Sequence, residues 1–269
     1  MKIIVSHDID HLTLWEHRAD LIIPKYKLRS MLEWIHGAIP TTEFFNRWLN
    51  LFTQQWQHLE NVITFNKKMG IPSTFFIAVR KGEGLAYPIS WVNFWIPRLK
   101  ELGAEVGIHG IEHQNIAIMQ EELETFQQIS RQGKIGIRMH YLRRDEATLG
   151  KLAQLGYMFD SSYDEWVDCY RIHKMWEFPL HIMDVYEIFE QGRYQKKPIR
   201  QIIKQTQSKI DKANESNFRY LTFLFHDRYY NHGDASFKQW YEESIMYMIE
   251  KGYTFCNYTQ AIEELEADL

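Results

Sequence analysis

Short runs of apolar and β-branched residues alternate with longer stretches of helical periodicity along most of this chain. The runs have the length of buried strands, and the stretches between them repeat apolar positions at the spacing of an amphipathic helix. Strands are predicted at residues 3–6, 73–79, 105–109, 135–138, 157–160, 176–180 and 220–226. Helices are predicted at residues 42–69, 91–102, 114–131, 145–155, 198–212 and 237–251.

Several predicted helices end at a glycine placed just before the next strand, namely Gly70, Gly103, Gly156 and Gly252. Glycine ends a helix readily because it adopts positive φ without a Cβ clash. About seven βα units result, and 269 residues fit one such domain. The alternation favours a single α/β domain with a parallel sheet closed into a barrel, although periodicity alone does not separate a barrel from an open, doubly wound sheet.

Residues 11–40 interrupt this alternation within the first βα unit and carry Trp15, Tyr26 and Trp34. In parallel barrels the loops that follow the strands surround the active site. We therefore expect an insertion at 11–40 that forms a rim or lid over the site and supplies aromatic contacts to a substrate.

The formal net charge of −4 is spread along the chain, so it predicts no attraction to nucleic acid or to an anionic membrane. The apolar run that begins at Met1 leads directly to His7 and leaves no room for a cleavable signal peptide. No stretch approaches the roughly 20 apolar residues of a membrane-spanning helix. We expect a cytoplasmic protein in which Cys169 and Cys256, which lie far apart in sequence, are free thiols.

Two groups of polar residues follow predicted strands and suggest a metal site. Asp8 and Asp10 stand at the end of the first strand, and His109 and His113 stand four residues apart at the end of the third. Residues four apart share one face of a helix, so both imidazoles reach one ion if the strand passes directly into a helix there. One carboxylate added to them makes a three-ligand set with an open position, as in catalytic zinc sites. Either group alone is often structural, but the carboxyl ends of barrel strands converge on one rim.

These groups resemble motifs of the polysaccharide deacetylase family, which is NodB-like and corresponds to carbohydrate esterase family 4. The segment 102–110 before the histidines is the most specific match, and Leu224-Phe225-His226 resembles the family's last motif. The resemblance covers about residues 1–260 and implies a distorted (β/α)7-type barrel. It also implies a hydrolase that removes an N-acetyl or related acyl group from an amide-bearing sugar, using one divalent ion, with Zn²⁺ preferred over other divalent transition metals.

The resemblance also implies a role for each matching residue. Asp8 is the expected general base, and the expected metal ligands are Asp10, His109 and His113. The family's common form has adjacent aspartates, whereas Ile9 separates them here. The division of roles between Asp8 and Asp10 therefore stays open.

The third motif of the family, usually Arg-x-Pro-aromatic, is similar to Arg138-Met139-His140-Tyr141, where His140 replaces the proline. The resemblance implies that Arg138 orients the base and that the backbone N–H of Tyr141 helps to hold the oxyanion. It also implies that His226 is the general acid.

Two further segments resemble the family less closely. Residues 159–164 are similar to the strand end of the fourth motif, but the corresponding aspartate is not identified. Residues 176–184 resemble a segment on the substrate side of related enzymes.

Three other interpretations compete with a deacetylase. The sequence from His109 to His113 also fits the His-x-x-Glu-His pattern of inverzincin peptidases with Glu112 as the catalytic residue, but Gly110 and the preceding strand-like run disfavour a helix there. The chain could instead hydrolyse another non-peptide C–N bond, as in a cyclic ureide. A carbohydrate-binding pseudoenzyme would use some of the 9 Trp, 15 Tyr and 16 Phe for sugar stacking, but every candidate catalytic residue is retained.

The expected substrate follows from the expected location. Without an export signal, a mature cell-wall polymer is an awkward substrate. We therefore expect a nucleotide-linked or lipid-linked saccharide from surface-polysaccharide biosynthesis, and no nucleic acid partner. The sequence does not indicate the oligomeric state.

Overall fold

A curled, mostly parallel β-sheet forms the centre of the computed structural model, which describes residues 1–52, 56–190 and 192–268. Strand β1 (Lys2–Ile9) lies inside this ten-stranded sheet, whose order is β6-β7-β5-β4-β3-β2-β1-β9-β8, with β10 also paired to β1. The other strands are β2 (Ser73–Ile77), β3 (Glu105–Gly110), β4 (Gly136–Met139), β5 (Phe159–Asp160), β6 (Tyr170–Ile172), β7 (Met175–Glu177), β8 (Ile182–Met183), β9 (Tyr220–Leu224) and β10 (Thr254–Phe255).

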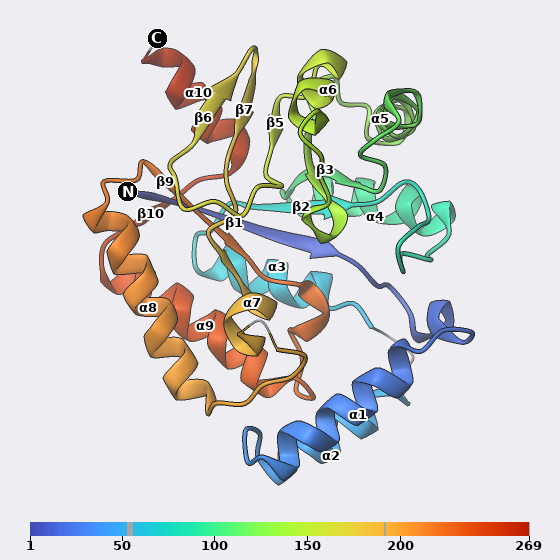
Figure 1. The fold of residues 1–269 in the computed structure, drawn as a ribbon, viewed down its shortest axis with the longest axis vertical. Helices are drawn as coiled ribbons and strands as arrows, with labels where there is room; N and C mark the ends of the chain where they lie inside the picture. Colours follow the sequence, from blue (N-terminus) through green and yellow to red (C-terminus); the bar gives the residue numbers. More distant parts are fainter. Residues whose placement is uncertain (53–55, 191, 269) are drawn as a thin grey trace.

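The sheet curls into a half-barrel (Figure 1). All its strand pairs are parallel except β6 with β7. Within the described part of the chain the two end strands, β6 and β8, do not pair with each other, so the barrel is not closed. Strands β2 and β9 are buried along their whole length, as expected for parallel strands covered on both faces. The predicted distorted barrel is confirmed.

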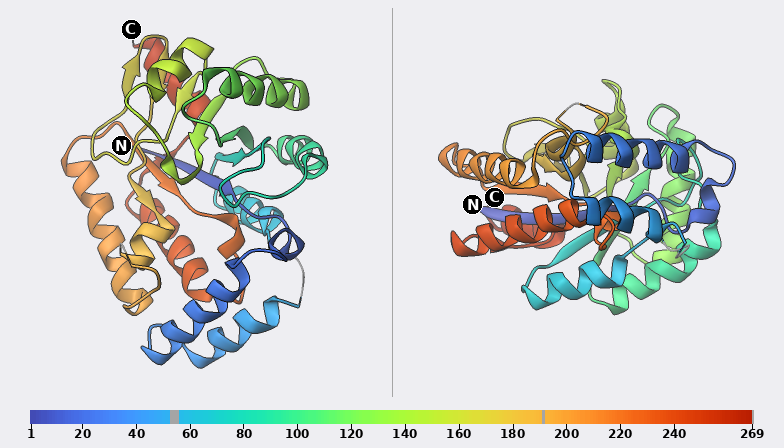
Figure 2. Two further views of the ribbon diagram at one scale, coloured as in Figure 1. Left: turned by 45° about the vertical axis from the view of Figure 1, so that its right-hand side comes forward. Right: turned by 90° about the horizontal axis from the view of Figure 1, so that it is seen from below.

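Helices cover the outside of the sheet (Figures 1 and 2). The four predicted glycine terminations are confirmed, since Gly70, Gly103, Gly156 and Gly252 all have positive φ. The helices are α1 (Ile22–Ile35), α2 (Thr41–Asn50), α3 (Leu59–Lys68), α4 (Ile89–Glu101), α5 (Ile116–Ser130), α6 (Thr148–Leu155), α7 (Asp184–Phe189), α8 (Ile199–Glu215), α9 (Ala235–Glu250) and α10 (Tyr258–Ala267). Three short 3₁₀ helices are η1 (Leu14–His17), η2 (His140–Leu142) and η3 (Asp227–Tyr229).

The predicted helix at 42–69 is wrong as a single element, because α2 and α3 are separate helices. Backbone N–H groups just before α3 form hydrogen bonds with residues distant in sequence. The N–H of Trp56 donates to the carbonyl of Leu12 at 3.3 Å, and the N–H of His58 donates to Oδ2 of Asp227 at 3.0 Å. These bonds replace the intrahelical ones that a continuous helix would need.

The insertion also extends beyond its predicted end. Residues 11–40 contain η1 and α1, but α2 continues the excursion and packs against α1 as a helical hairpin that projects from the barrel (Figure 1). None of the described helices is long and apolar enough to cross a membrane. Cys169 and Cys256 are both free thiols.

Close packing between neighbouring strands predicts a strong effect of one added methyl group. A Cβ on Gly136 of β4 would lie 2.0 Å from the buried ring of Phe159. We expect Gly136→Ala to lower the free energy of unfolding by about 1–3 kcal/mol, the usual cost of overpacking a core. Urea denaturation monitored by circular dichroism measures this.

Gly150→Ala is the matched control, because Gly150 lies in α6 and a Cβ there has no neighbour within 4 Å. We expect this variant to be as stable as the parent or more stable by up to about 1 kcal/mol, since alanine favours helix. Equal stability of the Gly136 and Gly150 variants would contradict the packing described here.

Candidate active site

Asp10, His109 and His140 converge where β1, β3 and β4 end. Oδ1 of Asp10 lies 3.4 Å from Nε2 of His109 and 3.5 Å from Nδ1 of His140. The two imidazole nitrogens are 3.0 Å apart. One ligand atom from each residue lies within 4.8 Å of the others, so the three side chains could hold a metal ion together.

The hydrogen bonds behind the two imidazoles leave the facing nitrogens without protons. Nδ1 of His109 lies 3.0 Å from the carbonyl of Arg138, and Nε2 of His140 lies 3.1 Å from the carbonyl of Glu83. A carbonyl only accepts, so each of these nitrogens donates its N–H. In neutral rings Nε2 of His109 and Nδ1 of His140 then carry lone pairs, as in metal-binding histidines oriented by a backbone carbonyl.

The carboxylate of Asp10 supports the same interpretation. Its Oδ1 is buried and accepts no hydrogen bond within the described part of the chain. A carboxylate oxygen without a donor beside two imidazole lone pairs could hold a cation, and two histidines with one carboxylate are a donor set found in catalytic zinc sites.

In the structure His140, and not His113, lies in one group with Asp10 and His109, and the ligand role that the motif gave to His113 stays a prediction. Strand β3 ends at Gly110 and α5 begins at Ile116, so the expectation that His109 and His113 share one helical turn is wrong. The group that includes Asp10 and His109 does not contain His113, although Nδ1 of His113 is also buried without a hydrogen-bond partner in the described part of the chain. The motif showed a histidine in the proline position at 140, but only the fold shows that this side chain reaches Asp10.

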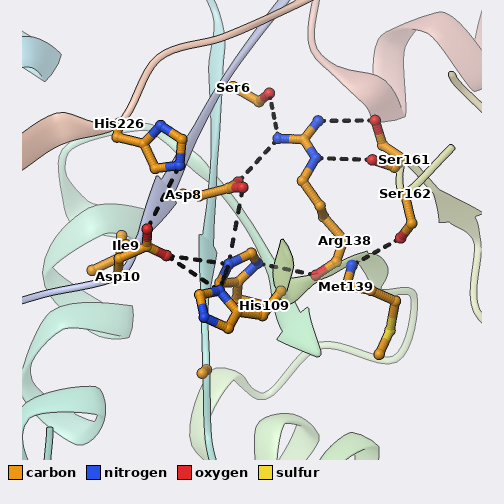
Figure 3. A network of polar contacts seen from close by, with 12 residues as sticks. Ser6, Asp8, Ile9, Asp10, His109, Arg138, Met139, Ser161, Ser162 and His226 are labelled. Carbon is orange, nitrogen blue, oxygen red and sulfur yellow. Dashed lines mark hydrogen bonds and ion pairs between the residues drawn. The ribbon is translucent and has the colours of Figure 1, made fainter. Parts of the chain in front are cut away.

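Asp8 lies beside this group and is held by Arg138 (Figure 3). An Nη1 hydrogen of Arg138 donates to Oδ1 of Asp8 at 3.0 Å, and Oδ2 of Asp8 lies 3.9 Å from Nε2 of His109. Burial alone would lower the pKa of Arg138, but Tyr258 and Asp8 raise that pKa above its ordinary value. The guanidinium therefore remains charged. As predicted for alternate positions of a strand, Asp8 and Asp10 face the same side.

His226 lies on the other side of Asp10, after strand β9. Its Nε2 is 3.6 Å from Oδ2 of Asp10, and its Nδ1 donates to Oδ1 of Asp184 at 2.7 Å. Burial alone would lower the pKa of His226, but the Asp184 carboxylate raises it, and the resulting pKa is about 10. The sequence interpretation did not select Asp184, although its position directly after a short apolar run was a weak signal of a strand end.

The backbone at Tyr141 is strained. Tyr141 and Leu142 have φ values of 55° and 52°, in the left-handed region that residues other than glycine seldom adopt. This turn stacks the Tyr141 ring over His140, with ring centroids 3.9 Å apart, and places Tyr141 at the edge of the site cavity. The expected N–H contact of Tyr141 with an oxyanion stays a prediction.

Asp160, from the weakly matched segment 159–164, lies beneath the site and does not line it. It accepts hydrogen bonds from the backbone N–H and the hydroxyl of Ser162 at 3.2 and 2.5 Å. Burial raises the pKa of Asp160 and also that of its buried neighbour Glu177. This carboxyl pair therefore supports the structure below the rim.

A second histidine group lies in the insertion and differs in one respect. His11, Glu16 and His17 are also close enough to share an ion. However, Nδ1 of His17 donates to Asp20 at 2.7 Å, and Nε2 of His17 can then accept the Nδ1 hydrogen of His11 at 2.8 Å. This pair is satisfied without an ion, whereas the pair at His109 and His140 is not.

Two connected hollows surround the candidate site. A cavity of about 320 Å³ is lined by Asp8, Asp10, His109, His140 and His226, among others. A larger groove of about 720 Å³ runs along helix α1 and shares lining residues with this cavity. The shared residues are His11, Arg29, Tyr141, Arg228 and Tyr229.

Solved structures with similar folds include a deacetylase homologue and an allantoinase. A protein from Mycobacterium smegmatis assigned as a polysaccharide deacetylase aligns with a TM-score of 0.64 at 14% identity, over 99% of this chain and 91% of that chain. Puue allantoinase aligns with a TM-score of 0.67 at 15% identity, over 99% and 90%. A GH57-type branching enzyme from Pyrococcus horikoshii aligns with a TM-score of 0.55 at 9% identity, over 97% and 70%.

No protein-family model matches the chain, and no curated protein does. At identities this low the likeness defines the fold alone. The chain has the fold shared by polysaccharide deacetylases and Puue allantoinase, which is the fold that its motifs led us to expect.

The geometry predicts which histidine binds metal. We expect His140→Ala to lose most of its bound zinc during dialysis, because one of three ligands is removed. We expect His113→Ala to keep its zinc, because His113 lies outside the group. Metal analysis of the purified variants measures both. Retention by His140→Ala together with loss by His113→Ala would support the ligand set implied by the sequence motif instead.

Proposed function

We propose that this protein is a metal-dependent hydrolase that removes an N-acetyl or related acyl group from an amide-bearing sugar. One observation carries the proposal. The Asp10–His109–His140 group lies between Asp8 and His226. The carboxylate of Asp8 is held by an arginine, and the imidazole of His226 is held by a carboxylate. Amide hydrolysis needs such an arrangement, with a base for the attacking water and an acid for the departing amine.

Each residue has a task in this reaction. A divalent ion held by Asp10, His109 and His140 would supply Lewis acidity toward the amide carbonyl and the attacking water. Asp8 would accept the proton that the water loses as it attacks the carbonyl carbon. His226 would donate its Nε2 proton to the amine nitrogen as the C–N bond breaks, giving a carboxylate and a free amine.

The groove beside the cavity supports a phosphate-linked sugar as the substrate. Lys25, Arg29, Arg193 and Arg228 line it, and no acidic residue lines it within the described part of the chain. Basic side chains, arginine above all, bind phosphate oxygens well. Four cations next to a hydrolytic centre fit a saccharide joined to a nucleotide or a lipid through phosphate, as the sequence interpretation expected.

The likeness to Puue allantoinase favours one alternative, hydrolysis of a cyclic ureide C–N bond. Both reactions can be assayed with the same zinc-loaded protein. We expect acetate release from N-acetylated sugar diphosphates and no turnover of allantoin. Turnover of allantoin alone would replace the deacetylase proposal, and the absence of both activities from metal-loaded protein would favour a carbohydrate-binding pseudoenzyme.

The roles of the two aspartates are tested by matched amide variants. We expect Asp8→Asn to keep its metal but to lower kcat about a hundredfold or more, the scale of general-base catalysis. Asp10→Asn should instead lose metal, because Asp10 belongs to the metal group. Metal content and kcat are measured on the same preparations. Loss of metal from both variants would mean that both carboxylates are ligands and that the base is another residue.

The pH dependence of kcat tests the role of His226. A general acid must be protonated, so activity should fall as the pH rises through the pKa of His226, which is about 10. Asp184→Asn removes the charge that raises this pKa. The alkaline fall in kcat should therefore move to lower pH by about one to three units, the usual effect of a close opposite charge.

Asp164→Asn is the control for this measurement, since Asp164 is partly exposed and pairs with Arg144. In this variant kcat should fall at the same alkaline pH as in the parent protein. If the alkaline fall in kcat of Asp184→Asn occurs at the same pH as in the parent protein, His226 is not the general acid.

A further inference from the structure

Three charged side chains of the α1–α2 hairpin lie on its inside. Glu33, Glu43 and Arg47 are almost completely buried. Arg47 forms ion pairs with both glutamates and donates through Nε to the carbonyl of Gly233 at 3.1 Å. The hydroxyl of Ser236 donates to Glu43 at 2.7 Å. A buried polar network therefore joins the hairpin to the barrel, in the place where helices usually pack apolar side chains.

Large apolar residues occupy the outside of the same helices. Phe45 and Leu49 lie one turn apart in α2, and Phe52 follows just beyond its end; Leu28 and Ile35 lie two turns apart in α1, and Leu21 stands just before its start. We call this set of side chains the outer apolar face, and each member is more than half exposed: Leu21, Leu28, Ile35, Phe45, Leu49 and Phe52. Contiguous exposed apolar side chains mark an interaction surface.

The charges around this face are mostly basic. Arg18 and Lys25 are exposed, and Lys27 lies over the Trp48 ring with 4.9 Å between Nζ and the ring centroid. One exposed acid, Asp20, also lies there and accepts a hydrogen bond from His17 at 2.7 Å. The net charge of −4 predicted no attraction to anionic membranes, but that value averages over the whole chain and includes acids that the hairpin buries.

We propose that the hairpin binds the surface of an anionic lipid bilayer, with the outer apolar face inserted among the lipids. Apolar residues with tryptophan and flanking Lys or Arg are the composition of helices that lie in the membrane interface. The basic residues favour acidic headgroups. A second copy of the chain fits this face less well, because a two-fold contact would bring the same basic residues close to one another.

Membrane binding by the hairpin would bring the catalytic cavity close to a lipid-linked substrate. The groove next to the catalytic cavity is lined on the hairpin side by Leu28, Arg29 and Leu32, and on the barrel side by Tyr141 and Arg228. Docking would place this groove at the level of the lipid headgroups. A lipid-linked sugar could then reach the cavity while its lipid stays in the bilayer. Binding itself does not depend on the proposed hydrolysis, so the test uses no sugar substrate.

Co-sedimentation with vesicles tests the proposal on the full-length protein. We expect binding to vesicles of phosphatidylcholine mixed with phosphatidylglycerol, and weaker binding to phosphatidylcholine alone or at high salt, which screens the basic residues. The double variant Phe45→Gln, Leu49→Gln should bind the mixed vesicles at least about tenfold more weakly, since it loses two inserting side chains. Failure of the parent protein to bind mixed vesicles would overturn the proposal.

The double variant Ile89→Gln, Phe94→Gln is the matched control, because both residues are exposed apolar side chains on α4. It should bind like the parent. Equal loss in both double variants would show a non-specific effect and overturn the assignment to the hairpin. Light scattering after gel filtration tests whether a second copy of the chain covers this face instead. A dimer that the Phe45 and Leu49 substitutions dissociate would show that the face is a subunit interface.

Discussion

The buried guanidinium of Arg138 holds together the parts of the chain that form the candidate site. Its Nε donates to the carbonyl of Ser161, its Nη1 to Ser6 and Asp8, and its Nη2 to Ser161 and Tyr258. All five N–H donors of arginine are thereby used. Removing such a charge from water is costly unless every donor is satisfied, so β1, β4, the loop after β5 and α10 must stay in this relative arrangement.

The same arrangement distributes charge around the candidate site. Asp8 lies on the side of Arg138, and His226 lies on the side of Asp184, with Asp10 and the facing histidines between them. Each proposed catalytic group therefore has a neighbour of opposite charge. The hairpin shows the opposite of the usual distribution, because it buries its ion pairs and exposes its aromatic and aliphatic side chains.

The alternation of strands and helices could be read from the sequence because it is a local property. Each of the seven predicted strands has a counterpart, and each helix stop at a glycine reflects the conformational freedom of that residue alone. Strands β6, β8 and β10 have two or three residues each and were not predicted, whereas β5 and β7 are equally short but lie in longer apolar runs, at 157–160 and 176–180. The break between α2 and α3 depends on bonds from Trp56 and His58 to distant residues, which no local pattern contains.

The sequence by itself determined the alternation of strands and helices and which strand ends carry carboxylates and imidazoles, and the resemblance of its motifs implied the barrel. It also placed Asp8, Asp10, His109 and His226 at positions that the fold brings together. Only the tertiary structure decided that His140, and not His113, reaches Asp10. The reason is physical: the path of a loop after a strand depends on what packs against it, whereas the direction of a side chain within a strand follows from its position alone.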